Sequence, residues 1–426
     1  MGRADMRDGP DWYRSGLDHI WLPYAQMKTA PLPLPVVRTQ GTRIHLSDGR
    51  ELVDGIASWW TACHGYNHPH IADAVQRQLA VMPHVMFGGL VNEQALTLAR
   101  RLAAMLPGDL DRVFFTESGS VAVEVAQKMA IQYWLNRGQK KRDTFVYFRG
   151  GYHGDTLATM AISDDAGMHN AFAGLLHRHV MAELPTDEEK EQALTALLEN
   201  NAERLAGIIV EPLVQGAGGM LFHDPVVLKR LRRLADRYDL LLIFDEIFTG
   251  FARTGTMFAC NSADVVPDII TLSKALTGGT LPLAATVARR KVFEAFWSDD
   301  PAHALMHGPT YMAHALGCAA ANASLDLFED GERLKQTAAI EGWLRAGIED
   351  CRDLPGVVDV RVRGAIGVVE LDHLDDVNKW RRAFIARGAF IRPIANVIYL
   401  TPALTMSEED VAFLTRTIAS VLRDNS

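Results

Sequence analysis

Residues 240–279, LLLIFDEIFTGFARTGTMFACNSADVVPDIITLSKALTGG, decide the fold. The apolar run 240–244 stops abruptly at Asp245 and Glu246, which is typical of a buried strand in a parallel sheet covered on both faces. A second short strand is predicted over 269–273, directly before Lys274. The pattern predicts that Asp245 and Lys274 lie at the sheet edge where open α/β proteins bind their ligands.

This pairing of an acid with a lysine suits pyridoxal phosphate chemistry. A lysine amine can hold the coenzyme aldehyde as a Schiff base, and an acidic partner keeps the pyridine nitrogen protonated. Either residue alone is more often a solvated surface charge or a helix cap. The hypothesis therefore depends on the joint pattern of strand, Asp245, strand, Lys274 and the Gly-Gly turn at 278–279.

Two segments carry a family resemblance. SKALTGG at 273–279 resembles the coenzyme-lysine segment of class III aminotransferases of pyridoxal-enzyme fold type I, and DEIFTGFARTG at 245–255 resembles their aspartate segment. Ala252 stands where the family generally has glycine, which leaves one detail of this loop open. The resemblance covers nearly the whole chain. It implies an α/β fold, with a large domain built on a mostly parallel sheet of the seven-stranded type and a small α+β domain.

Composition narrows the class of protein. The chain has 426 residues, 48% apolar and 22% charged, so it can bury a large core in more than one domain. A net charge of −9 argues against a nucleic-acid partner. No run reaches the length of a membrane helix, and the polar start is unlike a signal peptide. The scattered cysteines fit neither a disulfide framework nor a zinc site, so a cytoplasmic protein is expected.

Periodicity and breakers predict three parts. Residues 1–60 form a loose arm of sixteen residues and a β-hairpin, whose strands 36–46 and 51–55 are joined by a turn at 47–50 and which belongs to the small domain. Residues 61–328 form the large coenzyme domain, because strands and helices alternate from 113 to 287. Residues 329–426 form a small α+β domain. Helices are predicted over 71–81, 93–105, 188–206, 312–328, 333–351, 377–387 and 408–422.

Further coenzyme contacts are expected along the large domain. Ser118, Gly119 and Ser120 form a strand-to-helix junction of the kind that binds phosphate through backbone N–H groups. Such junctions also cap helices that bind nothing, so the phosphate role of Gly119 and Ser120 is implied by the resemblance. The resemblance likewise implies that Tyr152 stacks on the coenzyme ring. Ile247 is expected against the opposite face of that ring.

Two other segments complete the predicted coenzyme site. Glu211 ends the buried strand predicted over 207–210, which places another acid at the same sheet edge. A tight loop carries Gly308, Pro309 and Thr310. The resemblance implies that Pro309 and Thr310 reach the coenzyme phosphate of the other subunit, and hence a homodimer with shared active sites.

Five strings narrow the resemblance within the family: WLPY at 21–24, SWW at 58–60, HGYNHP at 64–69, HVMFGG at 84–89 and HGPT at 307–310. They resemble members that transfer the amino group of S-adenosylmethionine to 8-amino-7-oxononanoate, giving 7,8-diaminononanoate in biotin biosynthesis. The implied substrate-binding residues are Tyr24, Trp59, Trp60, Tyr152, Asp155, Lys274, Gly308 and Arg392.

The residue types fit two unlike substrates. Tyr24, Trp59 and Trp60 offer flat faces to a sulfonium cation and to an aliphatic chain, although the tryptophans could equally be a buried core pair. Arg392, on an apolar strand predicted within 389–400, needs an anion and can pair with the acceptor's distal carboxylate. Gly308 leaves room beside the coenzyme.

Alternatives remain at this point. The amino donor could be lysine, as in relatives of this enzyme. The chain could also be an omega-aminotransferase, an aminomutase, which would need no sulfonium-binding aromatics, or a binding protein that kept only the fold. The H-x-H pairs at 68–70 and 177–179 lack nearby acids or cysteines, so no metal site is predicted.

Overall fold

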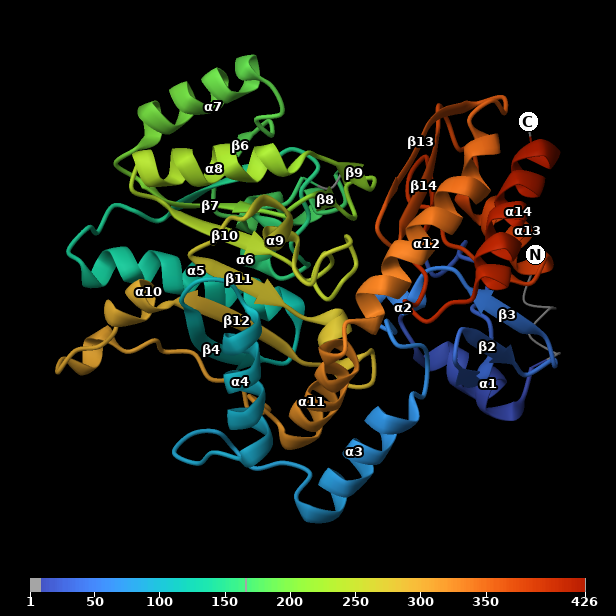
Figure 1. Cartoon of the computed structure of the whole chain (residues 1–426), viewed down its shortest axis with the longest axis horizontal. Helices are drawn as coiled ribbons and strands as arrows, with labels where there is room; N and C mark the ends of the chain where they lie inside the picture. Colours follow the sequence, from blue (N-terminus) through green and yellow to red (C-terminus); the bar gives the residue numbers. More distant parts are fainter. Residues whose placement is uncertain (1–8, 165–166, 426) are drawn as a thin grey trace.

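A seven-stranded sheet forms the centre of the computed structural model, which describes residues 9–164 and 167–425 (Figure 1). Its strands are, in spatial order, β4 (Leu110–Thr116), β12 (Ala284–Arg289), β11 (Ile269–Leu272), β10 (Leu241–Asp245), β7 (Leu205–Val210), β5 (Thr144–Phe148) and β6 (Val180–Ala182). Strand β12 runs antiparallel to both neighbours, and every other pair is parallel. The predicted large, mostly parallel sheet is confirmed.

Both faces of this sheet are covered. Leu242 and Phe244 of β10 belong to one buried cluster, whereas Leu241 and Ile243 belong to the other. This alternation explains the uninterrupted apolar run, because each face of a covered parallel strand must be apolar. On one face lies α5 (Gly119–Asn136). Helices that contribute to the opposite cluster include α4 (Glu93–Met105), α7 (Glu188–Asn201), α8 (Pro225–Arg237) and α11 (Ala315–Glu329).

A second region joins the two ends of the chain. Strand β15 (Ala389–Phe390) pairs in parallel with β3 (Glu51–Asp54), so the early and late segments lie side by side (Figure 1). Two further strands extend this sheet: β1 (Val36–Gln40) and β2 (Arg43–Leu46). This pairing supports the assignment of residues 1–60 to the small domain, although the division at 60 and 328 remains a prediction.

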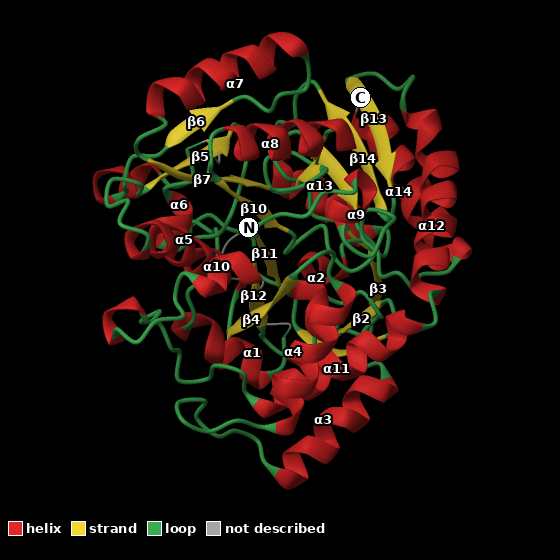
Figure 2. Cartoon of the chain, turned by 60° about the vertical axis from the view of Figure 1, so that its left-hand side comes forward, coloured by secondary structure: helices red, strands yellow, loops and turns green. Residues whose placement is uncertain are grey.

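The late segment also forms a three-stranded sheet, β13 (Val357–Arg363), β14 (Ile366–Leu371) and β16 (Val397–Leu400). Helix α12 (Glu332–Ile348) packs on β13 and β14, and α14 (Glu408–Asn425) packs on α12 (Figure 2). In the part of the chain that the structure describes, the other helices of eight or more residues are α3 (Pro69–Val81) and α13 (Val377–Ala386). Among the described helices, none combines the length and hydropathy needed to cross a bilayer.

Short elements connect these parts. They are α1 (Asp11–Gly16), η2 (Leu17–His19), α2 (Ala57–Trp60), α6 (Leu157–Met160), η3 (Asn170–Leu175), β8 (Val214–Gln215), β9 (Leu221–Phe222), α9 (Ala259–Ala263), η4 (Lys274–Thr277), α10 (Arg290–Glu294), η5 (Pro301–His303) and η6 (Glu349–Cys351).

Several sequence predictions need correction. The loose arm is wrong from residue 11, because Tyr13 of α1 is buried and its hydroxyl donates to the Pro33 carbonyl at 2.6 Å; residues 1–8 lie outside the described residues. The strand predicted over 36–46 turns at Gly41, whose φ of +56° ends β1. The helix predicted over 188–206 ends at Asn201, and Leu205 already begins β7.

The backbone conformation at Ala252 explains why the family generally has glycine at that position. Ala252 is fully buried and has a φ of +67°, in the left-handed region that glycine adopts without a steric penalty. Its N–H donates to the Met257 carbonyl at 3.1 Å, and its own carbonyl accepts from Gly255 at 3.1 Å. Alanine thus keeps the same turn, at a local cost of about 1–2 kcal/mol.

Candidate active site

Asp245 is the last residue of β10, and hydrogen-bond donors surround its buried carboxylate. One carboxylate oxygen accepts from the Thr271 hydroxyl at 3.1 Å and from the Ile247 N–H at 3.2 Å. The other lies 2.7 Å from Nδ1 of the buried His153. Sequence reasoning missed His153, although it stands beside Tyr152 in a glycine-flanked segment. These contacts leave the carboxylate with one orientation at the sheet edge.

Lys274 follows β11 in the first position of η4, with a φ of +48°. Its Nζ lies 4.2 Å from the centre of the Trp60 ring and 6.0 Å from that of Phe248. Burial lowers the pKa of Lys274 to about 8, against the opposing charges of Asp245 and Glu211. Roughly a tenth of the amine is therefore neutral and nucleophilic at pH 7, far more than for an ordinary lysine.

Tyr152 and Asp155 form the outer part of the same region. The Tyr152 hydroxyl donates to Asp155 Oδ1 at 3.0 Å, and the Tyr24 hydroxyl donates to Asp155 Oδ2. His169 Nε2 lies 3.1 Å from Asp155 Oδ1. Three donors thus surround the exposed carboxylate of Asp155, which joins the early segment at Tyr24 to the loop after β5.

Glu211, directly after β7, holds the backbone of this loop. Its two carboxylate oxygens accept from the backbone N–H groups of Tyr152, at 2.9 Å, and of Gly216, at 3.0 Å. Burial raises the pKa of Glu211 to about 7, with the charge of Asp245 acting in the same direction. The expected direct contact of Glu211 with the coenzyme remains a prediction, since both of its oxygens are engaged with the backbone.

The junction between β4 and α5 has the geometry of an anion site. Ser118 is the N-cap, and its hydroxyl accepts from the Val121 N–H at 3.4 Å. The N–H groups of Gly119 and Ser120 belong to the same first turn, where no helical acceptor is available. A Cβ on Gly119 would lie 3.0 Å from Ile247 Cδ1, so the Ile247 side chain flanks this junction.

The two adjacent tryptophans, Trp59 and Trp60, belong to an unusual turn. Residues 57–60 all have φ between +44° and +72°, which directs successive side chains differently. Trp60 is 7% exposed, packs on Phe248 and lies under Lys274, whereas Trp59 is 39% exposed. Trp60 is therefore a core residue and Trp59 is an exposed one, and the predicted contact of each with the substrate remains a prediction.

A buried carboxylate holds this turn. Asp54 accepts from the N–H groups of Ile56 and Ser58, both at 2.9 Å, and from the Tyr66 hydroxyl at 2.6 Å. A run of left-handed residues is unfavourable, so it requires such external support. Sequence reasoning missed Asp54, because nothing in the local pattern indicates a left-handed turn.

Arg392 lies just after β15, not on a strand as predicted, because the chain bends there before β16. Its guanidinium lies 5.1 Å from the centre of the exposed Trp59 ring, and Trp59 meets Tyr24 edge to face. Burial lowers the pKa of Arg392, and among the described residues no carboxylate pairs with it. A partly buried, unpaired arginine is suited to an anionic ligand.

Tyr399 is a neighbouring group that sequence reasoning missed. It lies on β16 inside an apolar run, its ring is 6.4 Å from that of Trp60, and its buried hydroxyl has no hydrogen-bond partner among the described residues. A position inside an apolar strand carries no sequence signal of a functional role.

The loop of Gly308, Pro309 and Thr310 is a separate feature. Gly308 and Thr310 are exposed, and the adjacent His307 contacts Lys128 at 3.0 Å. Within the described residues, no hydrogen bond or ion pair joins this loop to Asp245 or Lys274. The contact of Pro309 and Thr310 with the coenzyme phosphate of another subunit remains a prediction.

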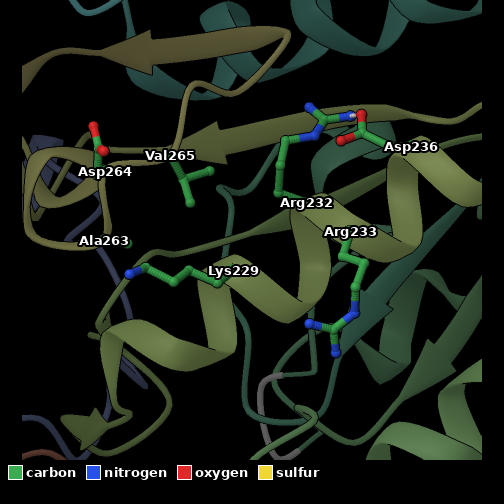
Figure 3. Close-up of a pocket in the computed structure, with 7 residues that line it drawn as sticks. All are labelled: Lys229, Arg232, Arg233, Asp236, Ala263, Asp264 and Val265. Atoms are coloured by element: carbon green, nitrogen blue, oxygen red, sulfur yellow. Dashed lines mark ion pairs between the residues drawn. The ribbon is translucent and has the colours of Figure 1, made fainter.

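A surface pocket of about 410 Å³ lies outside this site, on α8 and the end of α9 (Figure 3). Its arginines are already paired: Arg232 with Asp236 and Asp268, and Arg233 with Glu191. This pocket offers no group for the chemistry of Lys274.

Comparisons with known proteins agree with this geometry. The sequence profile of the family described as aminotransferase class-III matches residues 24–422. The adenosylmethionine-8-amino-7-oxononanoate aminotransferase of Mycobacterium leprae is 44% identical over 413 residues, covering 95% of this chain and 94% of that protein. The crystal structure of the enzyme of that name from Methanocaldococcus jannaschii superposes with a TM-score of 0.92 at 30% identity, covering 97% of this chain and 98% of that one. A PLP-bound amine transaminase from an uncultivated Pseudomonas species superposes with a TM-score of 0.90 at 30% identity, covering 96% and 99%.

Proposed function

Because the chain belongs to the class III aminotransferase family and is therefore a pyridoxal-phosphate-dependent enzyme, we propose that it transfers the amino group of S-adenosylmethionine to 8-amino-7-oxononanoate. The product would be 7,8-diaminononanoate, in biotin biosynthesis. One observation carries the choice of substrates: the unpaired Arg392 faces Trp59 on an aromatic wall that also contains Tyr24.

The residues present fit the coenzyme. Lys274 supplies a partly neutral amine, Asp245 supplies a carboxylate oriented by His153, and the first turn of α5 supplies N–H groups for a phosphate. When bound, pyridoxal phosphate supplies an electron-withdrawing ring that stabilises negative charge at the carbon bearing the amino group.

The chain's own groups then have separate tasks. Lys274 Nζ is the base that can remove the proton from the amino-bearing carbon of the substrate, because its lowered pKa keeps part of it neutral. Asp245 would hold a proton at the nitrogen of the coenzyme ring. Glu211 fixes the backbone of Tyr152 and so helps to hold the tyrosine ring where it would stack on the coenzyme.

Two unlike substrates must use this one site. Trp59 and Tyr24 can attract a sulfonium through their ring faces and can also cover methylene groups. Asp155 adds negative charge near Tyr24, and Arg392 adds positive charge beside Trp59. The wall can therefore serve both substrates. Arg392 matches a carboxylate, which both substrates carry, and we assign it to the distal carboxylate of the acceptor.

Arg392→Ala is expected to weaken the acceptor half-reaction selectively. The loss should be about 1–3 kcal/mol, because a charge-assisted hydrogen bond disappears and the acceptor carboxylate is left without its partner. Single-turnover absorbance changes of the coenzyme, recorded with each substrate alone, separate the two halves. The S-adenosylmethionine half should stay within about threefold of the unmodified enzyme.

Two variants control this test. Arg382→Ala removes an exposed arginine of α13, which is ion-paired with Asp376 at 3.5 Å, and should change neither half-reaction. Trp59→Ala should slow both. If Arg392→Ala slowed both halves equally, or neither, its assignment to the acceptor carboxylate would be wrong.

Lysine as donor remains the closest competitor to S-adenosylmethionine. An omega-aminotransferase would show turnover with simple amines in place of either donor, and an aminomutase would need no second substrate. The aromatic wall beside Arg392 supports the sulfonium donor over all three. The cytoplasmic location expected from the sequence stays a prediction.

We also propose that two copies of the chain form a homodimer with shared sites. Trp21 and Met306 are 87% and 85% exposed, and Val81 and Tyr311 are also strongly exposed. Tyr311 lies against His84, with ring centres 4.7 Å apart, so the rings of two separate segments meet there. Exposed apolar surface of this kind supports a protein interface next to Thr310.

Mixing two inactive variants tests this arrangement. If Pro309 and Thr310 act on the other subunit's coenzyme, heterodimers of Lys274→Ala and Thr310→Ala chains contain one intact site. About a quarter of the unmodified activity is then expected after random reassortment into dimers, in which half of the dimers have half of their sites intact. Differently tagged chains verify that heterodimers form. Verified heterodimers without recovered activity would contradict sharing.

A further inference from the structure

The turn that carries Lys274 is held by a buried chain of hydrogen bonds. The carbonyl of Ala275, one residue after the lysine, accepts from the Ser324 hydroxyl of α11 at 3.3 Å. Ser324 Oγ lies 3.0 Å from His64 Nε2. Arg333 Nε of α12 donates to His64 Nδ1 at 2.9 Å. All three side chains are buried, and none of them belongs to the substrate wall.

The donor inventory gives this chain a single direction. Arg333 has only donors, so His64 Nδ1 must be the acceptor and Nε2 must carry the hydrogen. His64 then donates to Ser324, whose own hydrogen remains for the Ala275 carbonyl. Burial, with the Arg333 charge, lowers the pKa of His64 to about 3, so the ring stays neutral. The orientation of each group therefore depends on the group before it.

The same histidine also contacts the far end of the turn. A Cβ on Gly278, the C-cap of η4, would lie 3.2 Å from His64 Cδ2. On the other side, the His64 ring packs on Phe328 with centres 4.7 Å apart. The neighbouring Cys63 thiol reaches the Ala275 carbonyl at 3.6 Å. His64 thus touches one end of the lysine turn directly and the other through Ser324.

Lys274 needs such support. Its left-handed backbone is unfavourable for a residue with a side chain and persists only where the surroundings determine it. We propose that His64 is a positioning residue, which acts through Ser324 to hold the Ala275 carbonyl and so keeps Lys274 Nζ over the Trp60 ring. The proposal rests on the proposed function, in which Lys274 carries the coenzyme.

Three variants test the individual hydrogen bonds between Arg333, His64, Ser324 and Ala275. Ser324→Ala removes the bond to Ala275. His64→Asn places an acceptor where Nδ1 was and keeps Arg333 paired, but its side chain is too short to donate to Ser324. His64→Gln places an amide N–H where Nε2 was and retains donation to Ser324. We expect Ser324→Ala and His64→Asn to lower kcat about tenfold with KM unchanged, and His64→Gln to stay within about threefold of the unmodified enzyme.

A second readout needs no turnover. The rate of Lys274 acetylation, followed by peptide mass spectrometry against pH in the coenzyme-free full-length protein, reports the pKa of the amine. Asp245 and Glu211 are the charged groups facing Lys274, and both remain in every variant. The midpoint should rise from about 8 in Ser324→Ala and His64→Asn, because a loosened turn exposes Nζ to water. His64→Gln should leave it unchanged.

Thr417→Val is the matched control, since it deletes a buried hydroxyl bonded to its own helix at Phe413. It should move only the melting temperature. An unshifted acetylation midpoint with unchanged kcat in Ser324→Ala and His64→Asn would overturn the proposal, as would equal losses in His64→Gln. Failure of the unmodified protein to attach coenzyme at Lys274 would instead refute the proposed function.

Discussion

Lys274→Ala should abolish covalent attachment of the coenzyme and lower the rate of amino transfer at least about 1,000-fold. The reason is that one amine has two tasks. Its lowered pKa makes it a nucleophile toward the coenzyme aldehyde, and the same neutral amine is the base placed to move the substrate's proton. Alanine removes both functions but leaves Asp245 and the first turn of α5 in place.

Borohydride reduction followed by peptide mass spectrometry measures the attachment directly. The unmodified protein should carry one coenzyme mass on the peptide that contains Lys274, and the variant should carry none. Lys335→Ala, which removes an exposed lysine paired with Glu332, should behave as the unmodified protein. If Lys274→Ala kept its turnover and borohydride reduction attached the coenzyme to a different lysine, the role assigned to Lys274 would be wrong.

Asp245→Asn should lower kcat by about 100- to 1,000-fold while changing coenzyme affinity about tenfold or less. The amide can keep the contacts with Thr271 and the Ile247 N–H, so the fold is retained. It has no negative charge to hold a proton at the ring nitrogen. The missing charge is needed most when the substrate carbon loses its proton, so the rate suffers far more than binding.

Thr271→Val is the matched control, because it removes a donor to the same carboxylate and leaves the charge. It should lower kcat less than about tenfold. Coenzyme affinity is measured by absorbance titration of the coenzyme-free protein, and kcat at saturating substrates. The role given to Asp245 would be wrong if the asparagine variant kept kcat within about tenfold of the unmodified enzyme, or if its affinity for the coenzyme fell as much as kcat.

Much of this site could be predicted from local sequence. Asp245 and Lys274 each follow a short apolar run, and the carboxyl ends of such strands meet at one sheet edge. The sheet with both faces buried follows from the same apolar runs. Family resemblance added Tyr152, Gly119 and Ser120, whose local patterns alone are ambiguous.

Contacts between distant segments could not be predicted in this way. Asp54 supports the Trp59–Trp60 turn only because four successive residues adopt left-handed backbone, which no propensity favours. His153 and Glu211 act through partners that the fold alone brings together. Arg392 was expected on a strand, but the chain leaves β15 before it, so the arginine is positioned by a bend next to Trp59.

The most direct test of the proposed reaction follows the nitrogen atom itself. The purified protein with coenzyme is incubated with 8-amino-7-oxononanoate and S-adenosylmethionine labelled with ¹⁵N at its amino group, and the product is analysed by mass spectrometry. We predict 7,8-diaminononanoate carrying one ¹⁵N atom, and no product when labelled lysine replaces S-adenosylmethionine. Labelled product from lysine alone, or no diamine with either donor, would contradict the proposed function.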